Sequence, residues 1–321
     1  MNKEFYLVPC ESKQYKTMLF HFATYNVLAS SNEGNLQDSS YLSFEVRYPK
    51  LLATIKEMVL FNAIIGLQEV DKTFYERISL YFNSVNYTYI YESYGIHGIL
   101  TAYPKDLYTE VSRKSLKVGE KITELCKDLD KSLCVKHQRC KKSSNAVKEA
   151  SKRKNILISV RLRREDKEFM VFNYHSPVVF YWIPIMGAHI SVVIGEIPED
   201  IPCILLTDLN NPPKSSIYNY ITKSKVRKAL KIHPNFPLTM CKGLVDVRSE
   251  LGITGYTTRN IDSKGKPFQD TLDYIFTSTH WRSIGFYQRY SSDIGEMEKF
   301  NYIPSLYEGS DHLPIIAVVG L

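Results

Sequence analysis

The sequence has few cysteines, no recognisable secretory start and one long apolar run. Six cysteines among 321 residues, without the basic-then-apolar order of a signal peptide, do not predict a disulfide framework and favour an intracellular, reducing compartment. The apolar run 178–197 has the length of a membrane span but contains Pro184, His189 and Glu196. Because such groups are costly in hydrocarbon, we expect no membrane span.

The overall composition is that of an ordinary globular protein. It is 44% hydrophobic and 23% charged, with 15 Gly and 14 Pro, which excludes collagen-like, low-complexity and wholly disordered chains. The length exceeds that of a typical domain of about 150 residues but suits one large α/β or two-sheet domain. We therefore expect a single domain over residues 1–321.

The positive charge is concentrated in one segment. The chain has 41 Lys and Arg against 34 Asp and Glu, a net charge of +7. Residues 113–154 contain fourteen of the former and five of the latter, so this insertion-like segment carries +9 and the rest −2. Such a segment attracts polyanions such as nucleic acid, although a solvated face, a flexible loop or a localisation signal gives the same pattern.

In the first half of the chain, apolar strands end in polar residues. The segment 20–28 is aromatic and β-branched, and it predicts a buried strand that contains Asn26 near its end. Apolar residues at helical spacing predict a helix over 48–59, with Pro49 in its first turn. The next strand, 63–70, ends in Glu69.

The second half repeats this pattern. The segments 156–162 and 168–175 predict a hairpin, and 202–209, 271–278 and 312–319 predict further strands. We also predict that Asp71 caps a helix, that 95–103 is a strand, and that 113–154 is partly helical with mobile parts. No internal repeat is visible.

Polar residues embedded in or next to these strands form the candidate site. A lone buried Asp or His is usually a structural hydrogen-bonding group, but eight such groups near successive strand ends predict one shared cleft. They are Asn26, Glu69, His175, Asp208, Asn210, Asp273, Asp311 and His312.

The chemistry of this set points to phosphate. Hard oxygen ligands with two imidazoles and no cysteine favour Mg²⁺ or Mn²⁺ over a structural zinc. A divalent cation, a carboxylate that deprotonates water and donors that neutralise negative charge are the requirements of in-line phosphodiester hydrolysis.

Six motifs in order resemble the endonuclease/exonuclease/phosphatase superfamily and cover residues 20–319. Within the superfamily, they are most similar to the nocturnin-like and carbon-catabolite-repressor deadenylase branch, which includes a 2′-phosphodiesterase. The motifs are YNVL (25–28), LQEV (67–70), NYH (173–175), LTDLNNPPKSSIY (206–218), LDYIF (272–276) and GSDHLP (309–314).

The resemblance implies a two-sheet α/β sandwich with flanking helices, like deoxyribonuclease I. It implies that Glu69 binds the metal, with Asn26 hydrogen-bonded at the same metal-phosphate site. Asp208 would orient or deprotonate the attacking water, while Asn210 steadies the phosphoryl oxygens.

The resemblance also gives roles to the two histidines. His312 would donate to the scissile phosphate, held in orientation by Asp273 or Asp311, and His175 would contact the same phosphate. Carboxylates around one metal titrate as a coupled group, so the resemblance leaves the identity of the base open.

Two residues depart from the family pattern. Thr207 stands where the family generally has Gly, and Ser176 stands where an apolar residue is common. Neither removes a catalytic group. The stretch after His175 lacks the Lys- and Gln-bearing helix expected of deadenylases, so adenine-specific recognition does not carry over.

The function we expect is a Mg²⁺-dependent phosphodiesterase acting on RNA, as a 3′-to-5′ exoribonuclease on single strands that releases 5′-mononucleotides. One alternative is a phosphatase or phosphodiesterase acting on a small nucleotide or a 2′,5′-linked oligonucleotide. Another is a non-catalytic RNA-binding protein on the same scaffold, against which the complete acidic set argues.

Two further segments have two interpretations each. Cys126, Cys134, His137 and Cys140 can chelate zinc, but their spacing matches no common finger and free cysteines are usually inert. The aromatic residues 180–182 can stack on bases or belong to the core.

Overall fold

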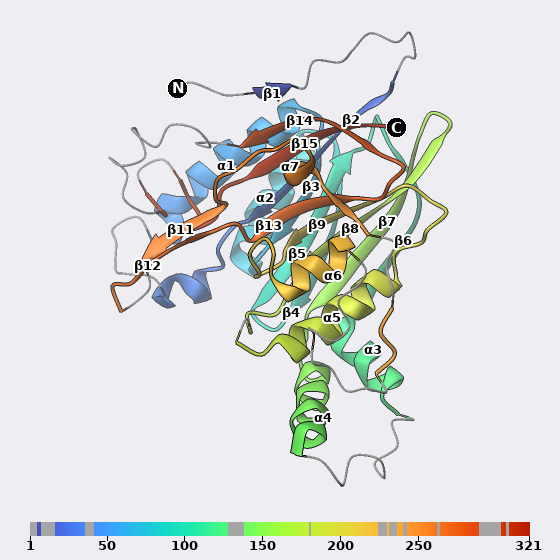
Figure 1. The fold of residues 1–321 in the computed structure, drawn as a ribbon. Helices are drawn as coiled ribbons and strands as arrows, with labels where there is room; N and C mark the ends of the chain where they lie inside the picture. The colour runs from blue at the N-terminus through green and yellow to red at the C-terminus, as the bar shows by residue number, and fades with distance from the viewer. Residues whose placement is uncertain are drawn as a thin grey trace.

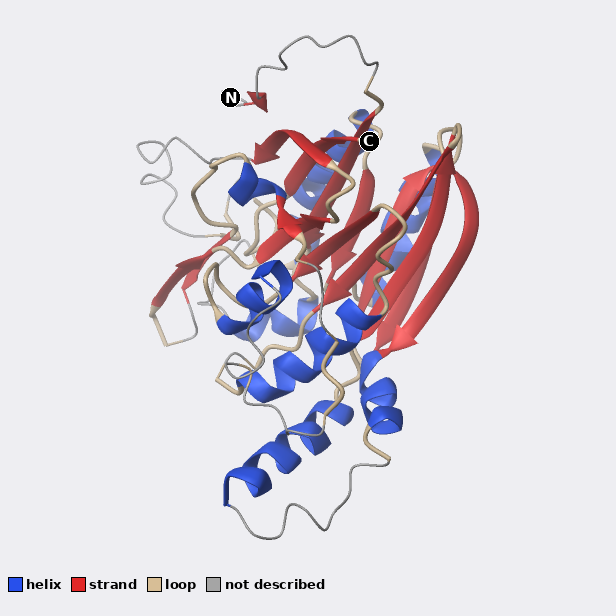
Figure 2. Ribbon diagram, turned by 45° about the vertical axis from the view of Figure 1, so that its right-hand side comes forward, coloured by secondary structure: helices blue, strands red, loops and turns tan. Residues whose placement is uncertain are grey.

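The computed structural model has two β-sheets packed face to face, with helices on both outer surfaces (Figure 1, Figure 2). The predicted two-sheet α/β sandwich is confirmed. The structure describes residues 5–7, 17–35, 42–127, 138–179, 181–223, 230, 236–239, 243–261, 264–288, 303–305 and 308–321.

The first sheet has seven strands. In spatial order they are β1 (Phe5–Leu7), β14 (Arg282–Gln288), β15 (Ile315–Gly320), β2 (Leu19–Asn26), β3 (Ile64–Gln68), β5 (His97–Pro104) and β4 (Tyr87–Tyr94). β2 and β3 are parallel, and β15 is antiparallel to β2. The ends of β2 and β3 and the start of β15 therefore lie at the same edge.

The second sheet has six strands. They are, in spatial order, β10 (Val245–Asp246), β13 (Asp273–Thr277), β9 (Cys203–Asp208), β8 (Lys167–His175), β7 (Ile156–Arg164) and β6 (Thr109–Lys117). The predicted hairpin is confirmed as β7–β8, and β8 and β9 are parallel. A separate ribbon pairs β11 (Thr258–Ile261) with β12 (Pro267–Asp270).

Helices cover the outer face of each sheet. The first sheet packs against α1 (Phe44–Leu60) and α2 (Lys72–Ser84). The second packs against α3 (Val118–Leu125), α4 (Gln138–Ser151), α5 (Ile183–Gly195) and α6 (Ser216–Lys223). Two short helices, η1 (Ser30–Asn35) and α7 (Val247–Glu250), follow β2 and β10. As predicted, Asp71 caps α2 and accepts a hydrogen bond from the N–H of Phe74.

The interior between the sheets is aromatic at one end and polar at the other. The ring of Phe20 packs edge-to-face on Phe169 and Trp281 at 5.2 Å, and such pairs add about 0.5–1.5 kcal/mol to the burial energy. Four residues after Phe169 on β8, Asn173 accepts at its Oδ1 from the Gln68 amide at the end of β3, at 2.8 Å. This polar contact joins the two sheets close to the edge where their strands end.

The first helix begins earlier than the sequence predicts. It starts at Phe44, so Pro49 lies inside α1 and not in its first turn. The reason is Arg47, which is fully buried and donates to main-chain carbonyls at Val27, Leu28 and Gly309. These contacts hold the additional turn against the core and outweigh the helix-breaking effect of Pro49.

The start of the basic segment is a strand and not part of a helix. Residues 113–117 belong to β6, which pairs with β7 along its length. Most of β6 is exposed because it is the edge strand of its sheet, so it has no apolar periodicity to mark it. The zinc site considered from the sequence falls largely outside the described residues, because Cys134, His137 and the side chain of Cys140 are not among them.

The long apolar run contains a helix buried against the second sheet. In α5, every residue from 185 to 194 is buried. Within the described part of the chain, no helix is both long and apolar enough to cross a membrane. Of the aromatic residues before α5, Trp182 packs against the core and Tyr181 is 73% exposed, while Phe180 lies outside the described residues.

Candidate active site

The strands of the second sheet place three site residues side by side. Asp208, the last residue of β9, pairs with His175 of β8 on one side and with Asp273 of β13 on the other. Because β13 is antiparallel to β9, its first residue lies where β8 and β9 end. All three side chains are buried.

One amide group connects this row to the first sheet. Asn26 Nδ2 donates to Glu69 Oε1 and to Asp208 Oδ2, both at 2.9 Å. Its Oδ1 accepts from the N–H of Leu28 at 3.0 Å. With both ends of the amide engaged, Asn26 holds two carboxylates of different sheets toward each other.

The main chain around Glu69 has an unusual conformation. Glu69, Leu28 and Asn210 have φ values of 56°, 56° and 52°, in the left-handed region that costs about 1–2 kcal/mol for residues with a Cβ. Glu69 Oε2 accepts from Asn32 Nδ2 at 2.5 Å and from the N–H of Ala29 at 3.2 Å. These contacts hold the carboxylate in position at the end of β3.

Glu69 is ionised at neutral pH. Burial raises the pKa of this carboxyl, but the charges of His175 and His312 and the amides of Asn26 and Asn32 lower it more, so the pKa lies below its ordinary value. A buried carboxylate kept ionised in this way is suited to bind a cation.

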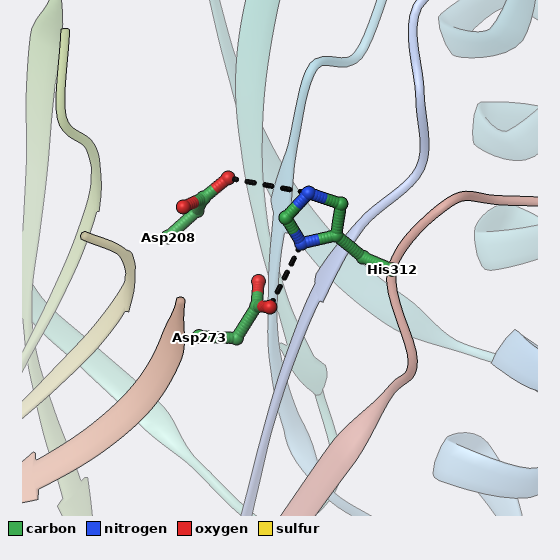
Figure 3. Close-up of side chains that lie close together, drawn as sticks. All are labelled: Asp208, Asp273 and His312. Atoms are coloured by element: carbon green, nitrogen blue, oxygen red, sulfur yellow. Dashed lines mark hydrogen bonds and ion pairs between the residues drawn. The ribbon is translucent and has the colours of Figure 1, made fainter. Parts of the chain in front are cut away.

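His312 lies between two aspartates (Figure 3). Its Nδ1 is 2.8 Å from Asp273 Oδ2, and its Nε2 is 3.9 Å from Asp208 Oδ2. Burial lowers the pKa of the imidazole, but the carboxylates of Asp273, Asp208 and Asp311 outweigh it and hold the pKa well above its ordinary value. His312 therefore carries a positive charge at neutral pH.

His175 is held through both ring nitrogens. Its Nδ1 is 2.8 Å from the hydroxyl of Tyr94. Its Nε2 is 3.1 Å from Asn210 Nδ2 and 3.6 Å from Asp208 Oδ2. The main-chain oxygen of His175 accepts from Asn155 Nδ2 at 2.9 Å. The ring thus faces the same carboxylate oxygen as His312.

Asp311 makes a different set of contacts from the other site residues. Its Oδ2 accepts from Asn260 Nδ2 at 3.1 Å, and its main-chain oxygen accepts from the hydroxyl of Thr258 at 2.7 Å. Burial raises the pKa of this carboxyl. Of the two aspartates that sequence offered as partners of His312, Asp273 contacts the ring.

Sequence reasoning missed Tyr94 and Asn32. Tyr94 is the last residue of β4, an edge strand of the first sheet, whereas His175 lies in the second sheet. No local sequence pattern therefore links the two residues. Asn32 lies in the Ser- and Asn-rich stretch after β2. The polar composition of that stretch is the sequence feature that could have pointed to Asn32. The two departures from the family pattern, Thr207 and Ser176, are buried.

The donor atoms at this edge suit a hard divalent cation. Asp208, Asp273 and His312 each have one potential ligand atom, and these atoms lie within 4.8 Å of one another. Because a protonated imidazole cannot ligate a cation, the carboxylates are the ligands available while His312 is charged. Glu69 Oε1 and Asp208 Oδ2 form a second pair, since both accept from Asn26. Oxygen-rich sets of this kind match the preferences of Mg²⁺ and Mn²⁺.

Comparison with known families agrees with this geometry. The pattern of the Endonuclease/Exonuclease/phosphatase family matches residues 23–312, from the strand that carries Asn26 to His312 itself. The chain belongs to this family. It is accordingly a hydrolase and phosphodiesterase, with the buried acidic and histidine residues at its site. No curated protein sequence matches the chain.

Three solved structures share the fold. ANGEL2, described as a 2′,3′-cyclic phosphatase in complex with adenosine-2′,3′-vanadate, has a TM-score of 0.76 and 18% identity, covering 100% of this chain and 99% of ANGEL2. The human Nocturnin catalytic domain has a TM-score of 0.62 and 16% identity, with 99% and 97% covered. D. rerio TDP2 complexed with a single-strand DNA product has a TM-score of 0.60 and 12% identity, with 94% and 99% covered.

Proposed function

We propose that this protein is a Mg²⁺- or Mn²⁺-dependent exoribonuclease that hydrolyses single-stranded RNA from its 3′ end and releases 5′-mononucleotides. The observation that carries the proposal is the position of Asp208. Its Oδ2 accepts from the Asn26 amide and faces both imidazoles, His175 at 3.6 Å and His312 at 3.9 Å. A base and two donors thus surround one point at the sheet edge.

Asp208 is the base in this proposal. Its Oδ1 accepts from the N–H of Asn210 at 2.9 Å, which fixes the plane of the carboxylate. Oδ2 takes a proton from the attacking water as the oxygen of that water bonds to phosphorus and the P–O3′ bond breaks, and the released O3′ takes up a proton from solvent to become a hydroxyl. Asn26 keeps Oδ2 oriented during this transfer.

The remaining residues stabilise the negative charge on the phosphate. Protonated His312 donates to a phosphate oxygen, and Asp273 keeps it charged and oriented. Asn210 and His175, which lie 3.1 Å apart, contact the same group. The Glu69 carboxylate would hold a divalent cation, which when bound would supply positive charge near the phosphate.

The charges of the basic segment support a polynucleotide substrate only in part. Ion pairs with glutamates at 2.6–2.9 Å hold Lys114, Lys117 and Lys121. Near the end of the segment, Lys148, Arg153 and Lys154 have no ion pair within 4.0 Å among the described residues. We assign the attraction for RNA to these three, since cationic groups that are not held in an ion pair are available to phosphates.

The position of these residues connects them to the site. Arg153 and Lys154 are exposed and directly precede Asn155, whose side chain donates to the main-chain oxygen of His175. A strand whose 3′ end occupies the site therefore has cationic residues close to its entry.

A panel of labelled substrates tests the function. Linear RNA with a 3′-hydroxyl, DNA of the same sequence, a 2′,5′-oligoadenylate and free nucleotide phosphates are incubated with Mg²⁺. We expect the highest kcat/KM on RNA. A higher kcat/KM on a nucleotide phosphate or on the 2′,5′-oligonucleotide contradicts the proposal and favours the small-molecule alternative.

The likeness to ANGEL2 favours a second candidate, hydrolysis of a terminal 2′,3′-cyclic phosphate. The same base and donors serve this reaction, because the ring also contains a phosphodiester. RNA ending in a 2′,3′-cyclic phosphate separates the two functions. A terminal phosphomonoester on RNA of unchanged length supports the second candidate, whereas shortening of the chain supports the first.

A further inference from the structure

A groove of about 610 Å³ lies between the start of α2 and the turn that joins β4 to β5. Its lining includes Ser31, which precedes Asn32, the residue whose amide donates to Glu69. Its volume is in the range of small-molecule sites, roughly 300–1,000 Å³. Tyr75, Tyr91 and Ile96 supply its aromatic and aliphatic lining, and Ser31, Thr73 and Ser93 supply hydroxyls. None of these residues has a role in the hydrolysis described above.

The groove is continuous with the catalytic residues through the chain. One wall is the β4–β5 turn, which carries Ile96; Tyr94, two residues earlier, lies 2.8 Å from His175 Nδ1. The opposite wall includes Asp71, two residues after Glu69. A substrate group next to the phosphate can therefore lie in the groove.

The lining suits a flat, uncharged group. The rings of Tyr75 and Tyr91 stack on each other with centroids 4.1 Å apart and planes 11° apart. Ile96 is 67% exposed, so its side chain is available for contact with a bound group. An aromatic and aliphatic surface with a few hydroxyls matches a nucleobase.

The charges of the groove argue against a phosphate. Its ionic side chains are Asp71, Glu76 and Lys72. Lys72 lies 3.7 Å from Glu76, and the carboxylate of Asp71 accepts from the N–H groups of Phe74 and Ser30. The net charge is negative, so the groove favours the neutral part of a nucleotide.

We propose that this groove binds an unpaired nucleobase of the substrate, on the nucleotide next to the scissile phosphate. We call it the base groove. The proposal rests on the proposed function in that it takes the substrate to be RNA. It assigns recognition of the base to residues outside the catalytic set, with Ile96 and the Tyr75–Tyr91 pair as the contact surface.

Binding measured in EDTA tests the groove without turnover. Fluorescence anisotropy compares a labelled RNA with the same RNA lacking its last two 3′ bases. Stacking on a protein surface contributes about 1–3 kcal/mol per base, so we expect the abasic RNA to bind wild-type protein roughly 5- to 150-fold more weakly. Equal affinities for the two RNAs contradict the proposal.

Variants assign any difference to the groove. Ile96→Ser and Tyr75→Ala should weaken binding of the intact RNA and leave binding of the abasic RNA unchanged. Leu80→Ser is the matched control, because Leu80 is a 70% exposed aliphatic residue on α2 that does not line the groove. An equal loss on both RNAs, or the same loss in the control, overturns the assignment.

The two proposals fail in different ways. A base-dependent affinity that Ile96→Ser removes, without hydrolysis of RNA when Mg²⁺ is added, supports the base groove and contradicts the exoribonuclease. Hydrolysis of RNA from its 3′ end, with an affinity that does not depend on the terminal bases, supports the exoribonuclease and contradicts the base groove.

Discussion

The imidazole of His312 and the carboxylate of Asp273 meet across the two sheets, with Nδ1 2.8 Å from Oδ2. His312 lies in the loop that leads into β15 of the first sheet, and Asp273 begins β13 of the second. The charged state of His312 therefore depends on the packing of one sheet against the other.

Replacing Asp273 with Asn should lower kcat by roughly 10²–10⁴-fold, because the neutral amide no longer holds the His312 proton. His312 must be charged to act, so activity falls as pH rises through its pKa. Without the Asp273 charge that pKa is lower, and the alkaline limb of the pH–rate profile should move to lower pH. If the alkaline limb of the pH–rate profile stays at the same pH in Asp273→Asn, Asp273 does not keep His312 charged.

Asp311→Asn is the matched control for that variant. The Asp311 carboxylate accepts from Asn260 and does not contact the His312 ring within the described structure. We expect a much smaller loss of kcat than for Asp273→Asn. Equal losses in the two variants contradict the assignment of Asp273 as the residue that orients His312.

Glu69→Gln and Asp208→Asn should each abolish hydrolysis and leave the fold intact. Both carboxylates are buried and accept from the same Asn26 amide, so removing one charge relieves repulsion. The proposed function assigns cation binding to Glu69 and proton transfer to Asp208. Circular dichroism should show an unchanged spectrum, and the melting temperature without metal should be equal or higher. Near-wild-type turnover, or loss of activity through unfolding, contradicts the account.

Acid stability should depend on His189, which is outside the site. Its Nδ1 is 2.8 Å from the hydroxyl of Tyr174, and its Nε2 is 2.9 Å from the main-chain oxygen of Ala150. Burial lowers its pKa to about 4. Below the ordinary value of 6.5 the unfolded chain binds a proton that the folded chain does not, so stability falls as pH falls toward 4.

The loss amounts to at most about 1.4 kcal/mol per pH unit over that window. Urea unfolding of wild type and of His189→Gln at several pH values measures it. The variant should show a shallower dependence on pH between 6.5 and 4. If the free energy of unfolding depends on pH in the same way in both proteins, His189 does not cause the loss of stability in acid.

The basic segment gives a prediction with an internal control. Changing Lys148, Arg153 and Lys154 to Gln should weaken RNA binding and flatten its dependence on salt, since each lost phosphate contact removes about 0.7 from the single-strand slope. The same change at Lys114, Lys117 and Lys121, which are paired with glutamates, should have a smaller effect. Equal slopes in the two triple variants contradict the assignment.

The sequence predicted the strands that carry the site because each is apolar and has a polar residue at or next to one of its ends. Asp208 and His175 follow this pattern, and parallel strands necessarily bring such ends together. The pattern contains nothing about Tyr94, whose contact with His175 depends on how the first sheet is placed over the second.

The local sequence also gave wrong or incomplete predictions where tertiary contacts determine the secondary structure or the partner of a side chain. Residues 113–117 have no apolar periodicity, and their pairing with β7 makes them a strand. The first turn of α1 exists because Arg47 is buried among carbonyls of distant loops. Whether Asp273 or Asp311 partners His312 was left open for the same reason, since only the packed sheets determine the distance.

The most direct test of the central claim follows a 5′-labelled linear RNA and a circular RNA of the same sequence in Mg²⁺, with and without EDTA. The account predicts that the linear RNA shortens progressively from its 3′ end, that 5′-mononucleotides appear, that the circle stays intact, and that EDTA stops the reaction. Cleavage of the circle at a comparable rate, or undiminished hydrolysis in EDTA, contradicts it.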